Sequence, residues 1–198
     1  MSKVYTGASM SIDGYIAGPG ESGFEHLFKW YGNGDVVVPT ANPEIPITTT
    51  QVSADHIRRI GELTGALVVG RKLFDSTDGW GGTHPWGVPV VVLTHTVPDG
   101  WPRDDAPFTF VSEGIEQAIE AAADLAGDKG VGLNGGTIAS QALDAGLLDE
   151  VWVDLVPVLL GGGTPFFDGL GVAPVELEGP VSIVESRDVT HMRFRVKR

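Results

Sequence analysis

Residues 130–143 read GVGLNGGTIASQAL, and this stretch decides the fold class. Residues 130–133 form a short apolar run, which is followed by Asn134, two glycines and, from about Gly136, helical spacing. This order predicts a buried strand, a tight turn and a helix. Because a strand that leads directly into a helix is the repeating unit of α/β sheets, the stretch favours an α/β fold.

The letters of residues 130–135 also match G-x-G-x-x-G, the fingerprint of dinucleotide-binding Rossmann folds. In that fingerprint the glycines follow the strand, whereas here Gly130 and Gly132 lie before and inside it. The acidic residue expected about 20 positions later should end the next strand. Asp154 is near that count, but it falls in the middle of an apolar run. The match is therefore a weak argument for a Rossmann dehydrogenase.

Apolar runs and helical segments alternate along the rest of the chain. The central runs are apolar throughout, which is typical of parallel strands covered on both faces. Predicted strands cover residues 4–10, 66–69, 88–93, 108–111, 130–133 and 151–156, with an antiparallel pair at 181–186 and 190–197. Predicted helices cover 24–31, 53–63 (with Ser53 as N-cap), 112–126 and 136–145, with a short helix after Gly70. We expect an α/β protein whose central sheet is mostly parallel and ends in a C-terminal antiparallel hairpin. Residues 32–52 are predicted to be irregular, and no linker divides the chain.

The composition limits the function. A net charge of −13 over 198 residues disfavours binding to nucleic acid. The absence of cysteine excludes disulfides and thiolate metal sites. The five histidines include no i, i+4 pair, so we expect no metal site. Neither a signal peptide nor a membrane-spanning run is evident, which favours a cytoplasmic protein with no membrane association.

Three segments at the ends of predicted parallel strands are candidate anion sites. Asn134-Gly135-Gly136-Thr137 opens a helix whose free N–H groups could hold a diphosphate, although the glycines could equally serve only a tight turn. Gly70-Arg71-Lys72 places two cations at a helix start, where the helix dipole disfavours them and a bound anion would resolve the conflict. Thr94-His95 follows a third strand, and both segments could also be ordinary solvated loops. Their shared location is where open α/β sheets bind ligands.

Five segments in this order resemble the dihydrofolate reductase-like superfamily. They are MSIDGYIAG (10–18), VVGRK (68–72), VVLTH (91–95), NGGTIASQAL (134–143) and DEVWVDLVPVLLGGGTPFF (149–167). The chain is most similar to the reductase domain of bacterial riboflavin biosynthesis and its stand-alone relatives. The resemblance runs from about residue 3 to residue 197. It implies a single three-layer α/β/α domain spanning residues 1–198, NADPH as the hydride donor, a small-molecule substrate and a homodimer.

The resemblance also implies where NADPH would bind. The adenosine 2'-phosphate would lie near Gly70, Arg71, Lys72, Thr94 and His95. The diphosphate would lie on Gly135, Gly136, Thr137 and Ile138. The nicotinamide would lie near Ala8, with Ile16 and Ala17 helping to cover the ring.

Departures from the dihydrofolate reductase pattern bear on the activity. Leu73 stands where those enzymes usually have threonine, so only a backbone N–H could donate there, and Ala139 replaces a common aromatic residue. The Pro-Trp segment before their catalytic carboxylate is missing. Asp13 is our first candidate for the proton donor or substrate anchor, because it follows the strand expected to meet the nicotinamide, although Asp13-Gly14 could also be only a turn. Glu25, on a predicted helix, is the second candidate.

The resulting hypothesis is an NADPH-dependent reductase of a small heterocyclic (pterin- or pyrimidine-like) or carbonyl substrate. Two alternatives stay open, namely a nucleotide-binding module without catalysis and a reductase that uses a flavin or deazaflavin in the same cleft. Residues 32–52 are expected to shape the substrate pocket. The glycines of LLGGGTPFF (159–167) could form another phosphate loop, but no clear amphipathic helix follows them.

Overall fold

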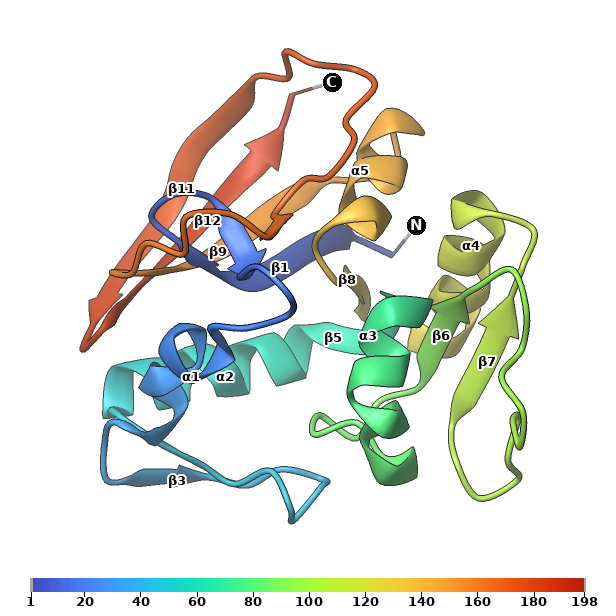
Figure 1. The fold of residues 1–198 in the computed structure, drawn as a ribbon, viewed down its shortest axis with the longest axis horizontal. Coiled ribbons are helices and arrows are strands. Elements are labelled where there is room, and N and C mark those ends of the chain that lie inside the picture. Colours follow the sequence, from blue (N-terminus) through green and yellow to red (C-terminus); the bar gives the residue numbers. More distant parts are fainter. Residues whose placement is uncertain (1, 198) are drawn as a thin grey trace.

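A mixed sheet of eight strands organises residues 2–197, which are the residues that the computed structural model describes. Its strand order is β11-β12-β9-β1-β8-β5-β6-β7. The six strands from β9 to β7 run parallel, β12 is antiparallel to them, and β11 is antiparallel to β12. The strands are β1 (Val4–Ser11), β5 (Thr64–Gly70), β6 (Val90–Leu93), β7 (Phe108–Val111), β8 (Gly130–Leu133), β9 (Glu150–Val156), β11 (Leu177–Ser186) and β12 (Val189–Val196). The C-terminal hairpin lies on the opposite side of the molecule from β6 and β7 (Figure 1).

Helices cover both faces of the sheet, as Figure 1 shows for α3 and α4 on either side of β6. The helices are α1 (Phe24–Leu27), α2 (Gln51–Leu63), α3 (Arg71–Ser76), α4 (Ile115–Ala126) and α5 (Thr137–Asp144), with 3₁₀ turns η1 (Lys29–Gly32) and η2 (Asp78–Gly82). Successive side chains of a strand point to opposite faces of the sheet, so each face packs into its own hydrophobic core. In β5, Val68 packs in the core that α4 and α5 cover, whereas Val69 packs with Phe74 of α3. The expected α/β fold with a mostly parallel sheet and a C-terminal antiparallel hairpin is therefore confirmed.

The sequence analysis did not predict four short strands. β3 (Val36–Val38) and β4 (Ile47–Thr49) pair with each other inside the segment 32–52, which was predicted to be irregular. β2 (Tyr15–Ala17) pairs with β10 (Thr164–Pro165). Strands of two or three residues are too short to show a hydrophobic period, so their pairing becomes visible only in three dimensions.

The N-cap of α2 is Thr50 rather than Ser53, so that prediction was wrong. The Thr50 hydroxyl accepts a hydrogen bond from the Ser53 N–H at 3.2 Å. The helix begins three residues earlier than expected because Thr50 is also a good capping residue. Ser53 consequently lies in the first turn with its side chain buried against the sheet.

No helix among residues 2–197 combines the length and the apolar character that crossing a membrane requires.

Candidate functional site

The three predicted anion-binding segments lie side by side at the carboxyl ends of three parallel strands of the sheet. They follow β8, β5 and β6, which are neighbouring parallel strands. Their carboxyl ends therefore point the same way, and Gly70 pairs in register with Leu93. This edge of an α/β sheet is the usual position of a ligand site.

Asn134 joins two of these segments. Its side-chain oxygen accepts a hydrogen bond from the Gly70 N–H at 2.9 Å, and its amide donates to the Gly135 carbonyl at 2.7 Å. The Gly70 Cα also packs closely on α5, since a Cβ there would lie 3.3 Å from Ile138. These contacts fix the end of β5 against the start of α5.

The start of α5 is built to bring backbone close to a ligand. Gly136, its N-cap, has φ +74° and ψ −140°, a conformation that is costly for other residues, and no side chain caps the helix. The first intrahelical N–H groups therefore have no partner within the helix. A Cβ on Gly135 would lie 2.9 Å from Ile16 Cδ1 and 3.3 Å from the Phe166 carbonyl oxygen, so this position leaves little room for a side chain.

The β2–β10 ribbon lies beside this turn. Gly136 donates a backbone hydrogen bond to the Phe166 carbonyl at 2.8 Å, and Ala17 pairs with Thr164. Ile16 is half-buried next to Gly135, whereas Ala17 is buried. The segments around residues 16 and 135 are therefore in contact.

The two cations at the start of α3, half-buried Arg71 and exposed Lys72, already carry partners. Arg71 pairs with Asp75 at 2.7 Å and donates to the Thr96 carbonyl at 2.8 Å. Lys72 pairs with Glu21 at 2.5 Å. Exposed pairs of this kind contribute little to stability and exchange readily, so an incoming phosphate could compete for both cations. Leu73, next in α3, is half-buried against the Phe74 core.

A small hollow of about 70 Å³ lies between the ends of β6 and β7. Thr94 and His95 line it on one side, and Phe110 and Ser112 on the other. Thr94 is buried and donates its hydroxyl to the Thr96 carbonyl at 2.9 Å, whereas His95 is exposed. The hollow is thus next to the carbonyl that holds Arg71.

A larger hollow of about 360 Å³ is lined partly by Asn42, Glu44 and Ile45. Its other wall comes from Thr77, Asp78, Trp80 and Gly81, at the far end of α3. Asn42 fixes the two walls together by donating to the Trp80 carbonyl at 2.9 Å. The segment 32–52 therefore contributes to a concave surface.

Asp13 holds the glycine loop after β9. Its carboxylate accepts hydrogen bonds from the Ser11 hydroxyl at 2.6 Å, the Leu160 N–H at 3.1 Å and the Gly161 N–H at 2.7 Å. The Ser11 bond is the largest of the effects that lower the pKa of Asp13, although its side chain is exposed. A carboxylate held in this way is suited to accepting hydrogen bonds rather than to donating a proton.

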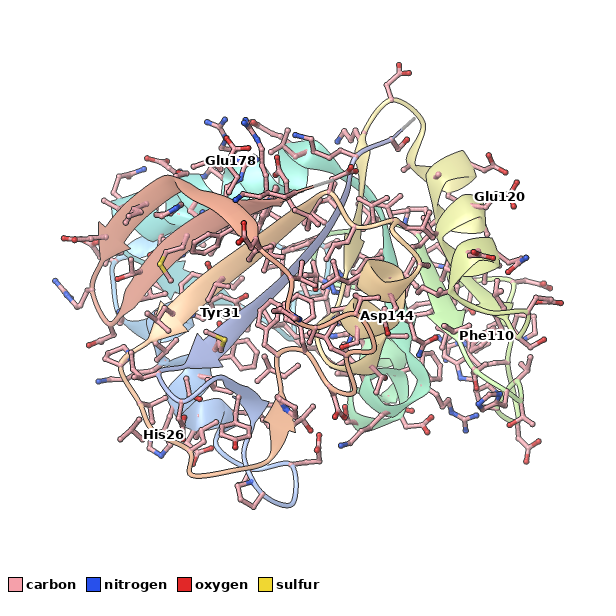
Figure 2. All side chains as sticks on the ribbon, turned by 90° about the horizontal axis from the view of Figure 1, so that it is seen from above. His26, Tyr31, Phe110, Glu120, Asp144 and Glu178 are labelled. Carbon is pink, nitrogen blue, oxygen red and sulfur yellow. The ribbon has the colours of Figure 1, made fainter. Side chains whose placement is uncertain are left out.

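Ala8 and Glu25 lie in different surroundings. Ala8 is half-buried in β1, in register with Val153 of β9. Glu25 lies in the first turn of α1 with 73% of its side chain exposed, 3.4 Å from His26. Its neighbour His26 lies at the periphery of the molecule (Figure 2).

The sequence analysis missed a cluster that joins three distant residues. His56 of α2, Asp154 of β9 and His191 of β12 place one potential ligand atom each within 4.8 Å of one another. Asp154 and His191 are register partners, but their separation in sequence hides this. The one available signal was a charged residue in the apolar run VWVDLVP, because a buried carboxylate requires partners.

Comparison with known proteins places this architecture in a family. The family model of the RibD C-terminal domain matches residues 2–190, which is nearly the whole chain. The chain belongs to the RibD C-terminal domain family. Among curated proteins, no sequence matched it.

Solved structures show the same fold as this RibD C-terminal domain. A riboflavin biosynthesis protein from Shewanella sp. PV-4 is 25% identical, with a TM-score of 0.67 over 99% of both chains. A Thermotoga maritima diaminohydroxyphosphoribosylaminopyrimidine deaminase/5-amino-6-(5-phosphoribosylamino)uracil reductase is 15% identical, with a TM-score of 0.63 over 99% of this chain and 57% of that one. Dihydrofolate reductase from Enterococcus faecalis, complexed with NADP(H), is 15% identical, with a TM-score of 0.55 over 99% of this chain and 97% of that one. The predicted resemblance to the dihydrofolate reductase-like superfamily is confirmed.

Proposed function

We propose that this chain is a single-domain, NADPH-dependent reductase of a small heterocyclic (pterin- or pyrimidine-like) or carbonyl substrate. The observation that carries the proposal is the convergence of three strand-to-loop junctions, after β5, β6 and β8, at one edge of a parallel sheet. Membership of the RibD C-terminal domain family and a solved neighbour that binds NADP(H) support a reductase-like role.

The residues at this edge fit a dinucleotide phosphate. Gly136 adopts a positive φ at an uncapped helix start, and Gly135 leaves no space for a side chain next to Ile16. We assign the diphosphate to Gly135, Gly136, Thr137 and Ile138, because the first N–H groups of α5 have no partner within the helix. Bound there, NADPH would supply a hydride to the substrate.

The 2'-phosphate is assigned to the cations of α3 and to the hollow beside them. Arg71 and Lys72 supply positive charge, and their present partners Asp75 and Glu21 are exposed carboxylates that a phosphate would replace. The backbone of Gly70 and Leu73 and the side chains of Thr94 and His95 complete the proposed subsite. This assignment predicts a preference for NADPH over NADH.

The remaining assignments concern the reacting end of the cofactor. Ala8, Ile16 and Ala17 would form the nicotinamide surface, since Ile16 lies against the Gly135 turn. We propose that Asp13 anchors the substrate, because its lowered pKa keeps the carboxylate charged and able to accept hydrogen bonds. Glu25 is the second candidate for proton delivery, either directly or through water.

Two further functions use the same edge of the sheet. The departures Leu73 and Ala139 from the dihydrofolate reductase pattern leave open a nucleotide-binding module without catalysis. A flavin or deazaflavin could occupy the same cleft and make the chain a reductase of another class.

We also propose that the protein acts in the cytoplasm on a small molecule and forms a homodimer. The acidic charge of −13 supports a partner other than nucleic acid. The edge strand β11 supports self-association, because Ile183 is 55% exposed and Val181 is 38% exposed on a long unpaired edge.

The test of function is NADPH consumption by the purified full chain with a panel of pterin-like, pyrimidine-like and small carbonyl compounds. The proposal predicts turnover with at least one member of the panel. NADPH binding without turnover of any compound would support the nucleotide-binding module. A yellow protein that reduces or retains a flavin would instead support a reductase that uses a flavin or deazaflavin.

A further inference from the structure

The proposed reduction needs a proton as well as a hydride, and the two candidates from the sequence are poorly placed to supply it. Asp13 is engaged as an acceptor of three hydrogen bonds, and the side chain of Glu25 is 73% exposed. A general acid acts within hydrogen-bond reach of the reacting atom, or through one water. A titratable group that is sheltered by the fold and close to the proposed cofactor site is therefore the better source.

The central strand β1 has open space on the face that α2 covers. Gly7 is half-buried, although β9 and β8 flank its strand on both sides. A Cβ on Gly7 would lie 3.6 Å from Trp152 Cβ and, apart from its chain neighbours, would meet no other described residue within 4 Å. The pairing of β1 with β8 ends one residue before Gly7, so Gly7 is level with Asn134, where the turn of the proposed diphosphate site begins. The next residue, Ala8, belongs to the proposed nicotinamide surface, so the space over Gly7 adjoins the proposed cofactor site.

A pair of titratable side chains lies on the same face, one step farther along the strands. Asp154 follows Trp152 by two residues in β9, so both point to the face that α2 covers, and Asp154 is in register with Ser9 of β1. Diagonal neighbours on adjacent strands are about 7–8 Å apart, which brings Asp154 within reach of a small molecule over Gly7. His56 of α2 places its Nε2 3.1 Å from Asp154 Oδ1, and the two side chains are 12% and 15% exposed. Both groups are thus sheltered and still accessible.

The two histidines that contact Asp154 differ in their hydrogen bonds. His191 uses both ring nitrogens, because its Nδ1 lies 2.7 Å from Asp154 Oδ1 and its Nε2 lies 3.0 Å from Ser53 Oγ. The ring of His56 stacks on that of His191, with centroids 3.8 Å and planes 19° apart, so its Nε2 is close to Asp154 without a hydrogen bond of good geometry. Neither nitrogen of His56 forms a hydrogen bond with any residue that the structure describes, and Nε2 is the buried one. His191 therefore holds Asp154 in place, whereas His56 Nδ1 remains available to a bound molecule.

The charges of the cluster favour one proton that can be passed on. Burial alone would raise the pKa of Asp154, but the nearby rings of His191 and His56 outweigh burial and lower it, so the carboxylate stays ionised. One carboxylate balances one imidazolium, whereas two imidazolium rings stacked 3.8 Å apart would repel each other. Because His191 is 2% exposed, the proton that an incoming molecule can reach is the one on His56.

The other titratable and charged groups around the cluster do not compete for this role. Tyr31 of η1 faces Asp154 from within the body of the molecule (Figure 2). Burial and then the charge of Asp154 raise the pKa of Tyr31, so its hydroxyl stays neutral. Arg193 follows His191 by two residues in β12 and is paired at 2.8 Å with Glu150, at the other end of β9.

We propose that His56 donates the proton that the substrate takes up during reduction, with Asp154 and His191 as its positioning residues. The inference rests on the proposed reductase function. When a hydride adds to the carbon of a C=O or C=N bond over Gly7, the π electron pair of that bond moves to the oxygen or nitrogen, and the Nδ1–H of His56 protonates this atom. His56 is left neutral and regains a proton from solvent. The substrate thus gains one hydride and one proton.

The test measures kcat across about pH 5 to pH 9 for the wild type, His56→Gln and the control His26→Gln, on a panel that includes 7,8-dihydropterin for C=N and benzaldehyde for C=O bonds. His56→Gln should lower kcat by about 10²- to 10⁴-fold, the contribution of a general acid, and abolish the fall of kcat at high pH. Its affinity for NADPH should stay unchanged. Asp154→Asn should lower kcat less and move the fall of kcat to lower pH, because the imidazolium loses its counter-charge. His26→Gln changes a histidine that is 59% exposed outside the cluster and should behave as the wild type.

A second readout does not need turnover. In the full chain labelled with ¹³C at histidine Cε1, the signal that is missing from His56→Gln identifies His56. Adding 7,8-dihydropterin or benzaldehyde should shift this signal and leave that of His26 in place. Gly7→Val keeps His56 but fills the space over β1, so it should abolish the shift, and it serves as the deciding variant if the circular dichroism of His56→Gln differs from the wild type.

The outcomes separate this inference from the proposed function. Equal kcat and an unchanged pH profile in folded His56→Gln, with turnover by the wild type, would overturn the inference and leave the reductase function standing. A His56 signal that neither compound shifts, or that shifts equally in Gly7→Val, would overturn it as well. Turnover of no panel compound by the wild type would overturn the inference together with the proposed function.

Discussion

At the scale of single residues, most buried charge is compensated by partners distant in the sequence. Glu150 of β9 is 2% exposed, yet it binds Lys3 at 2.7 Å, Arg193 at 2.8 Å and the Trp152 indole at 2.8 Å. Burial alone would raise its pKa, but these three hydrogen bonds outweigh burial and lower the pKa to about 2. Glu150 is therefore a carboxylate on which the acid stability of the protein depends.

The expected result is a loss of stability in acid. A carboxyl whose folded pKa is below its unfolded value of 4.5 stabilises the fold above pH 4.5, and this contribution disappears as the pH falls toward 2. The shift corresponds to about 3 kcal/mol at neutral pH. Urea unfolding should show that Glu150→Gln is destabilised by roughly this amount at pH 7 and by about half as much or less near pH 3.

Glu178→Gln is the control, since Glu178 lies on β11 with 60% of its side chain exposed and 3.8 Å from Arg195. Its effect should be small at both pH values. Equal destabilisation by Glu150→Gln at pH 7 and near pH 3 would show that the carboxylate charge is not what stabilises this part of the sheet.

A second prediction at the scale of single residues concerns Asp13. Asp13→Asn removes the charge that the Leu160 and Gly161 N–H groups and the proposed substrate contact require. We expect KM for the substrate to rise and the pH dependence of kcat to keep its shape, because the wild-type carboxylate is an acceptor. Steady-state kinetics across pH measures both quantities. If the fall of kcat at high pH disappeared in Asp13→Asn, Asp13 would instead be the proton donor.

At the scale of elements, the long apolar segments were predictable and the short ones were not. β8 and α5 follow from the order of apolar run, double glycine and helical spacing, because local propensity and tertiary packing agree there. β2, β3, β4 and β10 depend on pairing with residues far along the chain, and the sequence offers no period for them. The His56–Asp154–His191 cluster escaped for the same reason, since register between β9 and β12 brings two of its members together.

The prediction at the scale of elements concerns the start of α5. Gly136→Ala puts a Cβ on a residue with φ +74° and ψ −140°, which should cost about 1–3 kcal/mol in stability and tilt the N–H groups assigned to the diphosphate. NADPH affinity should fall in the folded variant, as measured by fluorescence titration. Gly146→Ala, which has φ +69° and open space just after the same helix, is the matched control. Unchanged NADPH affinity in Gly136→Ala would remove α5 from the proposed site.

At the scale of the whole molecule, the exposed edge strand bears on assembly. If β11 forms the proposed homodimer interface, Ile183→Lys should convert the protein from dimer to monomer in size-exclusion chromatography with light scattering. Leu125→Lys changes another exposed apolar side chain, 46% exposed on α4, and should leave the dimer intact. A wild-type protein that is monomeric at all accessible concentrations would contradict the dimer.

The central claim for the whole molecule is that the carboxyl edge of β5, β6 and β8 binds NADPH, and its most direct test is a binding titration. Wild type, Arg71→Ala and Arg58→Ala should each be titrated with NADPH and NADH. Arg58 pairs with Asp55 on the surface of α2, as Arg71 pairs with Asp75 on α3, so it is a matched control. A lost charge-assisted bond to phosphate costs about 1.5–3 kcal/mol. We therefore expect Arg71→Ala to weaken NADPH binding roughly 10- to 150-fold while NADH binding and Arg58→Ala stay unchanged. No binding of either cofactor by the wild type, or equal NADPH affinity in all three proteins, would contradict the account.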